Sequence, residues 1–267
     1  MAVPFLENIK NIMACPRCKA ALLLNESRDA ECAHCHEVYR WMSYTWDLVP
    51  SCWNTSSTAW LAWEHLQANG LESYRHDPQH NLAVGPREDC LQFSRFCKFD
   101  GLVLDVGCGP QAWPTYFAHH AEGTRFVGVD PLAGGIPADY AQFRALGEFL
   151  PFADRVFDHV AFATSLDHFI DPLPVLREAC RVCRPSGFVD IWVGDKSSGA
   201  APRKVSHPWY DKLQKPNGAE DVFHLKRLGS TELRRILGRL DVQLVDDARC
   251  RVNDHSTNYF CKLQVPV

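Results

Sequence analysis

The sequence lacks an excess of positive charge. Its 267 residues include 28 Lys and Arg against 32 Asp and Glu, a formal net charge of -4 at pH 7. Nucleic acid is held mainly by clustered basic groups, so this balance disfavours nucleic acid as the default partner. A local basic patch remains compatible with the same totals.

The sequence also lacks a long apolar run. No stretch approaches the ~20 consecutive apolar residues that a membrane-spanning helix needs. The first residues show no basic segment followed by an apolar one, the pattern of a secretory signal. We therefore expect no membrane span and a cytoplasmic location. With 46% hydrophobic residues, the chain can form one sizeable core with a small satellite unit, which excludes a disordered protein.

Cysteine is too sparse for a disulfide-stabilised scaffold, at 12 of 267 residues. Four cysteines nevertheless form two tight pairs, Cys15 with Cys18 and Cys32 with Cys35. A gap of two residues folds each pair into a turn, so the four sulfurs can surround one tetrahedral Zn²⁺. Free thiols or two disulfides are the alternative. With four sulfur ligands the ion would be structural, because no position remains for water.

Helical and strand-like patterns organise the rest of the chain. Helical spacing predicts a helix over residues 57–75, with Gly70 as its expected end, and a second helix over 87–99. We expect a small unit at 1–50, a helical linker or cap at 51–90, and the main domain at 91–267.

Strand-like runs alternate with segments long enough for a helix, which predicts βαβ units and a mostly parallel sheet. The last two runs are separated by only a short loop, so they should pair as an antiparallel hairpin at one sheet edge. These runs cover residues 102–106, 125–129, 157–163, 187–193, 241–250 and 257–265.

A glycine loop, LVLDVGCGP, follows the first predicted strand of the main domain. Gly107 and Gly109 let the backbone approach a ligand at the carboxyl edge of the sheet. Ala112 stands at the third glycine position of the dinucleotide pattern, which slightly disfavours a nicotinamide dinucleotide as the ligand. Asp105 would repel a pyrophosphate but can hold an ammonium group. Asp130, at the end of the next strand, can accept hydrogen bonds from two ribose hydroxyls, so the ligand is expected to contain a ribose.

With these residues the chain resembles the class I S-adenosylmethionine-dependent methyltransferases, of the type 11 kind. The resemblance continues through GEFLPFADRVFDHVAF, SLDHFIDP and LREACRVCRPSGFVDIWV, and covers about residues 90–267. It implies an α/β fold with a Rossmann-like, doubly wound sheet of seven strands. It also implies S-adenosyl-L-methionine as cofactor and a transferase activity that moves its methyl group.

The resemblance also implies which residues contact the cofactor. Gly107 and Gly109 would line its methionine part, Asp130 would bind the ribose, and Leu132 would cover the adenine. The chain departs from the family at Leu146, where many members have Asp or Asn for the adenine amine. The full expected set is Asp105, Gly107, Cys108, Gly109, Asp130, Pro131, Leu132, Gly147, Glu148, Phe149, Thr164 and Leu166.

The N-terminal unit resembles zinc ribbons that are fused to or partnered with methyltransferases. Examples are the activator subunit of tRNA methyltransferases and bacterial rRNA guanine methyltransferases. The shared pattern is CPRC, a hydrophobic stretch, a second CxxC and an aromatic residue. In the rRNA enzymes the ribbon helps to hold RNA. Basic residues in this unit are balanced by acids, which predicts a poor RNA clamp.

Asp167 and His168 follow the strand at 157–163, at the edge where an acceptor would meet the cofactor. His168 is the expected general base if the acceptor must first lose a proton, and packing is the alternative. His207 and His224, in and after an irregular insertion, are expected either in an acceptor pocket or in a solvated loop.

The predicted acceptor is a small molecule, a carbohydrate or a lipid-linked intermediate, because of the charge balance and the many aromatic residues. Two rival hypotheses remain. One is an rRNA or tRNA base methyltransferase that uses the ribbon to bind RNA. The other is a non-catalytic scaffold that only binds the cofactor.

Overall fold

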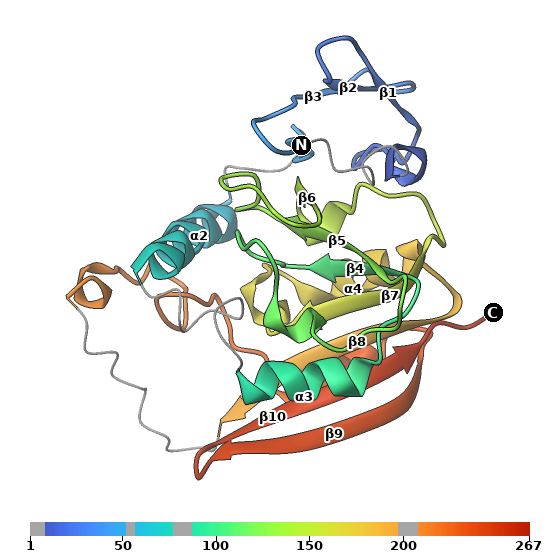
Figure 1. Cartoon of the computed structure of the whole chain (residues 1–267). Helices are drawn as coiled ribbons and strands as arrows, with labels where there is room; N and C mark the ends of the chain where they lie inside the picture. The colour runs from blue at the N-terminus through green and yellow to red at the C-terminus, as the bar shows by residue number, and fades with distance from the viewer. Residues whose placement is uncertain (1–8, 52–56, 77–86, 197–207) are drawn as a thin grey trace.

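The computed structural model describes residues 9–51, 57–76, 87–196 and 208–267 (Figure 1). His207 and residues 77–86 of the predicted linker lie outside these ranges. In the part of the chain that the structure describes, no helix is long and apolar enough to cross a membrane.

The N-terminal unit is a small antiparallel sheet with strand order β1-β2-β3 (Figure 1). Its buried side chains belong to the same hydrophobic core as those of the main sheet. The carboxylate of Asp47 lies 2.6 Å from the guanidinium of Arg144, and the hydroxyl of Thr45 donates to the carbonyl of Gln142. This unit therefore covers the β6 edge of the main sheet. Its elements are η1 (Lys10–Ile12), β1 (Leu22–Leu24), β2 (Ala30–Cys32) and β3 (Val38–Tyr39).

The main sheet has seven strands in the order β6-β5-β4-β7-β8-β10-β9. Strands β4 to β8 pair in parallel, whereas β10 pairs antiparallel with both β8 and β9. The predicted Rossmann-like sheet with its C-terminal antiparallel hairpin is confirmed. The strands are β4 (Leu102–Val106), β5 (Arg125–Asp130), β6 (Ala141–Arg144), β7 (Phe157–Ala163), β8 (Cys183–Lys196), β9 (Gln243–Asn253) and β10 (Ser256–Gln264).

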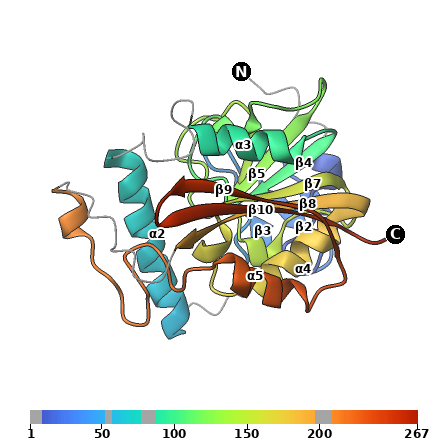
Figure 2. The ribbon, with the colours of Figure 1, turned by 90° about the horizontal axis from the view of Figure 1, so that it is seen from below.

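Helices cover both faces of the sheet. In Figure 2, α3 lies on one face and α4 and α5 lie on the other. Alternation along β4 explains this arrangement, since Val103 packs with Phe93 of α3, whereas Leu104 belongs to the core that includes Leu176 of α4. The helices are α2 (Thr58–His76), α3 (Glu88–Cys97), α4 (Pro172–Val182) and α5 (Ser230–Leu237), with short 3₁₀ turns η3 (Thr115–Phe117), η4 (Gly147–Phe149), η5 (Leu166–His168) and η6 (Tyr210–Lys212).

Two local predictions were wrong. The helix expected to end at Gly70 continues to His76, because contacts along α2 outweigh the ~1 kcal/mol helix penalty of one glycine. Between β4 and β5 only the short turn η3 forms in place of a crossover helix. Pro110 and Pro114 interrupt that segment, and stacked rings such as Phe117 on Phe126 pack it against the sheet.

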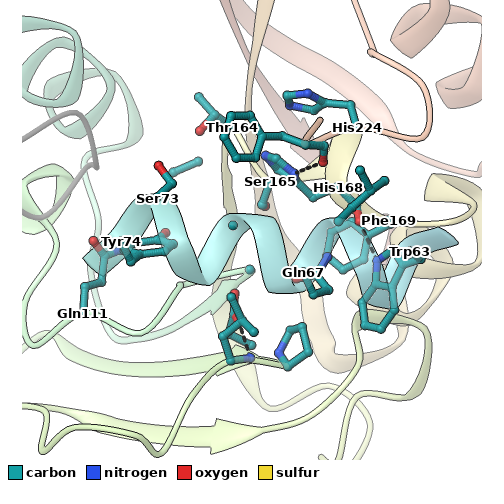
Figure 3. Close-up of a pocket in the computed structure, with 18 of the residues that line it drawn as sticks. Trp63, Gln67, Ser73, Tyr74, Gln111, Thr164, Ser165, His168, Phe169 and His224 are labelled. Carbon is teal, nitrogen blue, oxygen red and sulfur yellow. Dashed lines mark hydrogen bonds between the residues drawn. The ribbon is translucent and has the colours of Figure 1, made fainter. Parts of the chain in front are cut away.

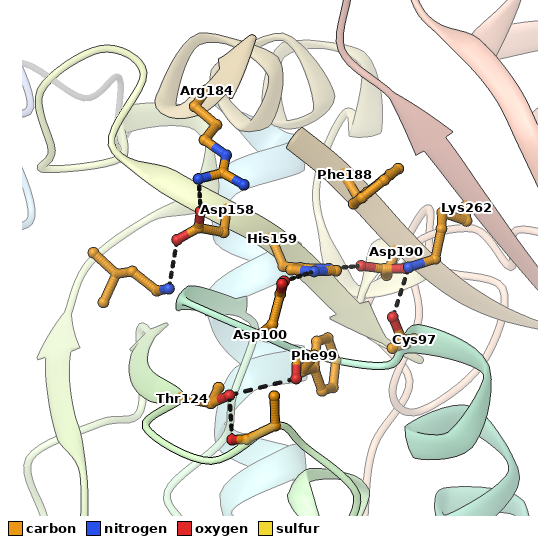
Figure 4. A network of polar contacts seen from close by, with 12 residues as sticks. Cys97, Phe99, Asp100, Thr124, Asp158, His159, Arg184, Phe188, Asp190 and Lys262 are labelled. Atoms are coloured by element: carbon orange, nitrogen blue, oxygen red, sulfur yellow. Dashed lines mark hydrogen bonds and ion pairs between the residues drawn. The ribbon is translucent and has the colours of Figure 1, made fainter. Parts of the chain in front are cut away.

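A buried polar network joins β7, β8 and β10 away from the glycine loop (Figure 4). His159 lies between two carboxylates, with Nδ1 2.7 Å from Asp190 and Nε2 2.9 Å from Asp100. The ammonium of Lys262 is 3.1 Å from the other oxygen of Asp190, and it donates to the carbonyl of Cys97. Because each buried charge has an opposite partner, the network connects neighbouring strands without leaving an isolated charge.

Candidate functional site

Four cysteines converge in the N-terminal unit. The sulfurs of Cys15, Cys18, Cys32 and Cys35 all lie within 4.8 Å of one another. Cys18 and Cys32 are 3.3 Å apart, and Cys15 and Cys35 are 3.7 Å apart. The backbone N–H groups of His34 and Cys35 donate to the sulfur of Cys32. Four sulfurs with backbone donors around them form the ligand set that a tetrahedral Zn²⁺ prefers, so the residues present fit that ion.

The glycine loop turns sharply after β4. Gly107 and Gly109 have φ values of 81° and 67°, which favour glycine. A Cβ on Gly107 would lie 2.4 Å from the Cβ of Ser165, so any side chain there would collide. The hydroxyl of Ser165 donates to the carbonyl of Val106 and holds the turn after β7 against this loop. The glycine loop therefore packs closely against the turn after β7.

Two buried carboxylates lie behind and beside this loop. Asp130 accepts hydrogen bonds from the backbone N–H groups of Gly109 at 2.8 Å and Leu132 at 2.7 Å. Asp105 accepts one from the hydroxyl of Tyr116 at 2.6 Å. Burial raises the pKa of Asp105 to about 7 and that of Asp130 to about 6. A cationic ligand would favour the ionised form of both.

Buried hydrogen-bond acceptors without a partner also lie near the glycine loop. In the described ranges, Oδ1 of Asp105 and Oε1 of Gln111 are buried without a hydrogen-bond partner. Gln111 lines the pocket, and its amide nitrogen donates to the carbonyl of Cys108. Buried acceptors of this kind call for a donor. A ligand that carries an ammonium group and hydroxyls would supply one, so the loop and its acids fit the expected cofactor.

A pocket of about 310 Å³ lies at the carboxyl edge of the parallel strands (Figure 3). Helix α2 forms one wall, and the loops after β4, β5 and β7 form the opposite wall. Its lining includes Trp63, Leu66, Gln67, Gly70, Ser73, Tyr74, Gly107, Gln111, Asp130, Pro131, Leu132, Thr164, Ser165, His168, Phe169, Phe223 and His224.

The predicted cofactor residues divide into two groups. Gly107, Asp130, Pro131, Leu132 and Thr164 line the pocket. The others are not part of its lining. Cys108 is buried near Gly128 and Tyr140, Gly147 packs against Phe169, and Leu166 borders a second cavity. Glu148 is half-buried, and desolvation raises its pKa to about 7. Asp105, Gly109 and Phe149 also lie off the wall.

Helix α2 contributes residues that the sequence interpretation missed. Tyr74 reaches the glycine loop, where its hydroxyl lies 2.2 Å from the Cβ that Gly109 lacks. Gly70 faces the pocket with no atom within 4 Å of its missing Cβ. Trp63, Gln67, Gly70 and Tyr74 recur at intervals of three or four residues, so their shared helix face could have been recognised.

Long-range hydrogen bonds hold α2 in this position. The indole N–H of Trp63 donates to the carbonyl of His168 at 2.8 Å. The side-chain amide of Asn69 donates to the carbonyls of Gln214 and Val222. Trp63 also packs on Trp60, with ring centroids 4.8 Å apart. Both tryptophans pack with Leu146, the residue where the chain departs from the family pattern.

The end of the pocket away from the glycine loop holds a cluster of three side chains, Asp167, His168 and His224. His168 and His224 lie with ring centroids 4.4 Å apart (Figure 3). Nε2 of His224 is 3.5 Å from one oxygen of Asp167, and Nε2 of His168 is 3.9 Å from the other. Asp221, which no sequence pattern singled out, binds Nδ1 of His224 at 2.8 Å.

These features define the class of the fold and site. A glycine loop follows the first parallel strand, an acid ends the next strand, and a pocket opens at the carboxyl edge. This is the nucleoside-binding arrangement of Rossmann-like α/β proteins.

Comparison with known proteins narrows the class. Residues 104–191 match the family model described as a methyltransferase domain. An uncharacterized methyltransferase from Schizosaccharomyces pombe is 28% identical over 159 residues, which cover 52% of this chain and 56% of that protein. The chain thus matches little more than half the length of that relative. Within residues 104–191 the chain is therefore similar to a methyltransferase domain.

Solved structures share the fold. A 1,6-didemethyltoxoflavin N1-methyltransferase from Burkholderia thailandensis, with its substrate and S-adenosylhomocysteine bound, has a TM-score of 0.54 and 16% identity, and the match covers 93% of this chain and all of that chain. A possible histamine N-methyltransferase from Thermotoga maritima has a TM-score of 0.50 and 15% identity, covering 76% and 99%. The 4+2 cyclase SpnF has a TM-score of 0.51 and 14% identity, covering 79% and 97%.

Proposed function

We propose that this protein transfers a methyl group from S-adenosyl-L-methionine to a small-molecule acceptor. The observation that carries the proposal is a single pocket whose two ends have different chemistry. At one end are the glycine loop and Asp130, and at the other are His168 and His224. A donor and an acceptor bound in such a pocket would meet near Thr164, between these ends.

The proposed cofactor fits the chemistry of its end of the pocket. Asp130 would accept hydrogen bonds from the ribose hydroxyls, and the buried carboxylate of Asp105 would stabilise the positive charge of the methionine part. When bound, the cofactor supplies an already activated methyl group. The protein then mainly aligns the acceptor with that group and excludes water.

A small acceptor suits the enclosed shape. Helix α2 and its hydrogen bonds to residues 168, 214 and 222 leave a cavity within the size range of small-ligand sites. The methyltransferase from Burkholderia thailandensis holds 1,6-didemethyltoxoflavin together with S-adenosylhomocysteine. We propose that Asp167 and His168 contact this acceptor.

An RNA acceptor is the less favoured candidate. Basic side chains of the N-terminal unit are engaged with acids: Lys19 with Glu178 at 2.6 Å, Arg40 with Asp29 at 2.6 Å, and Arg17 with Glu37 at 3.9 Å. Paired cations release fewer counterions on binding a polyanion, which weakens the drive for RNA binding.

We further propose that the four cysteines hold one structural Zn²⁺. The ion would connect the turn before β1 with the turn between β2 and β3, in a unit whose strands are only two or three residues long. Such short strands bury little apolar surface of their own, so the ion would contribute to folding. Elemental analysis of the purified chain should find one zinc per molecule.

The test of the function incubates the full chain with methyl-labelled S-adenosylmethionine and extracts of metabolites and RNA, followed by mass spectrometry. We expect label in a small molecule. Label in RNA would establish the rival acceptor. Cofactor binding by calorimetry without any labelled product would favour the non-catalytic scaffold.

A further inference from the structure

Three potential metal ligands meet on the acceptor side of the pocket. Asp167 and His168 come from η5 after β7, and His224 comes from the loop before α5. One ligand atom from each residue lies within 4.8 Å of the other two. Both histidines line the pocket, so an ion between the three side chains would face its interior.

Hydrogen bonds fix the orientation of both imidazole rings. Nδ1 of His168 is 3.3 Å from the carbonyl of Phe223, and Nδ1 of His224 is 2.8 Å from the carboxylate of Asp221. A carbonyl or carboxylate oxygen only accepts, so Nδ1 carries the hydrogen in each ring. Nε2 of each neutral ring then has a free lone pair directed toward Asp167. Metal-bound histidines show this pattern, with the second nitrogen donating to an oxygen.

The distances leave a gap that an ion would fill. Nε2 of His224 and Nε2 of His168 are 3.5 and 3.9 Å from the oxygens of Asp167, too long for strong hydrogen bonds. Donors that share one ion at about 2.1 Å stand roughly 3.0 to 3.4 Å apart in octahedral or tetrahedral geometry. Small rotations of the side chains are therefore enough to close the site.

The surrounding charges fit a divalent cation. Asp167 supplies a carboxylate next to the two imidazoles. Asp221 is held by Nε of Arg227 at 2.7 Å as well as by His224, so it supports a ligand and is not itself free to bind. Two histidines and one carboxylate leave several positions of a first-row ion open, and those positions point into the pocket.

We propose that Asp167, His168 and His224 bind a divalent first-row metal ion whose open positions take an oxygen of the acceptor. This role for the ion rests on the proposed function, and it makes the acceptor a hydroxyl compound such as a phenol or enol. The ion would acidify the bound hydroxyl, whose proton would pass to solvent water. Methyl transfer would then form the new O–C bond while the electron pair of the breaking S–C bond stays on sulfur, which leaves S-adenosylhomocysteine. His168 is then a ligand in place of the general base expected from the sequence.

Manganese binding tests the site without cofactor or acceptor. The zinc-loaded chain is titrated with Mn²⁺ alone, and free Mn²⁺ is followed by electron paramagnetic resonance. We expect one bound Mn²⁺ per chain. Asp167→Asn, His168→Ala and His224→Ala should each weaken binding at least tenfold, and Asp221→Asn should weaken it less. His119→Ala, at an exposed histidine outside the pocket, is the matched control.

Two results would overturn the site: no Mn²⁺ binding by the wild-type chain at millimolar concentration, or equal binding by wild type and all three ligand variants. Asp167→Asn keeps the shape of the side chain, and melting curves verify that each variant is folded. Binding of S-adenosylhomocysteine is measured on the same samples by calorimetry. If the wild-type chain binds S-adenosylhomocysteine but no Mn²⁺, the ion alone is refuted. If it binds Mn²⁺ but no S-adenosylhomocysteine, the proposed function alone is refuted.

Discussion

The four-cysteine centre and the Asp167–His168–His224 cluster are both groups of potential metal ligands, but they are built differently. The cysteines come from two short turns. Cys18 and Cys32, whose sulfurs are in contact, are 14 residues apart along the chain, and Cys15 and Cys35 are 20 residues apart. The second cluster joins the turn after β7 to a loop before α5, with β8 and the insertion between them. The first has four protein ligands and no open position, whereas the second has three and faces a pocket.

This difference separates a contribution to folding from a contribution to chemistry. A closed set of four sulfurs leaves a metal nothing further to bind, so its energy goes into stability. An open set beside a pocket contributes little to the fold and acts on what enters. Changes at the cysteines should therefore lower stability, and changes at the pocket should alter binding in a folded chain.

The largest expected effect is at Cys32, which is fully buried. Cys32→Ser removes a ligand and should lower the free energy of unfolding by about 4 kcal/mol or more, because the N-terminal unit has little core of its own. Zinc content and thermal melting measure the outcome. Cys250→Ser on β9 is the control and should melt within a few degrees of wild type. If the Cys32 variant were as stable as wild type, the four-cysteine centre would not contribute to folding, and its contrast with the pocket cluster would fail.

Gly70→Leu should lower ligand affinity without lowering stability, the opposite of the result expected at Cys32. The new side chain would enter the pocket, where no atom lies within 4 Å of the missing Cβ, and it should lower nucleoside or acceptor affinity at least tenfold. Leucine is a better helix former than glycine by about 0.8 kcal/mol, so α2 should not lose stability. Calorimetry and melting curves are compared with Ala68→Leu, on the exposed face of α2. Unchanged affinity would show that α2 does not cover the site.

Asp130→Asn should weaken S-adenosylhomocysteine binding by roughly 10- to 100-fold, the value of one or two hydrogen bonds to a charged group. The amide oxygen can replace only one of the two acceptors of Asp130, so the bond from the N–H of Gly109 or of Leu132 is lost as well and contributes to the change. Calorimetry with Asp139→Asn as the matched control measures the change. Equal affinity of the two variants would exclude a ribose contact at Asp130.

The smallest effect is a pH dependence of cofactor affinity. Burial raises the pKa of Asp105 to about 7 and that of Asp130 to about 6, so the stability these groups contribute is present at low pH and lost as pH rises through those values. The cationic cofactor needs the ionised carboxylates. Its affinity should therefore rise by roughly tenfold between about pH 5.5 and pH 8. Calorimetry of wild type and Asp105→Asn checks this, and the variant should show a flatter profile.

Much of the fold could be predicted because its signals are local. The β-branched and leucine runs of β4, β5 and β7 have the length of buried parallel strands, and the short loop between β9 and β10 requires an antiparallel hairpin. The missing crossover helix after β4 was less predictable. There, aromatic contacts such as that between Phe117 and Phe126 replaced regular helix formation.

The candidate site could be predicted only in part. Gly107 and Asp130 stand at sequence positions tied to strand ends, so their place at the pocket follows from the strand pattern. The positions of Tyr74 and Asp221 are not tied to a strand end or to any other sequence pattern. Tyr74 reaches the glycine loop only because α2 packs across the strand ends, and Asp221 matters only because His224 turns toward it.

The amino-acid sequence by itself determined the paired cysteines, most of the strands of the main sheet and the glycine loop, because each depends on residues that are neighbours along the chain. Only the tertiary structure decided that α2 covers the pocket and that His224 joins Asp167 and His168. Those contacts connect distant segments, and their formation depends on how whole elements pack around one core and not on any local pattern.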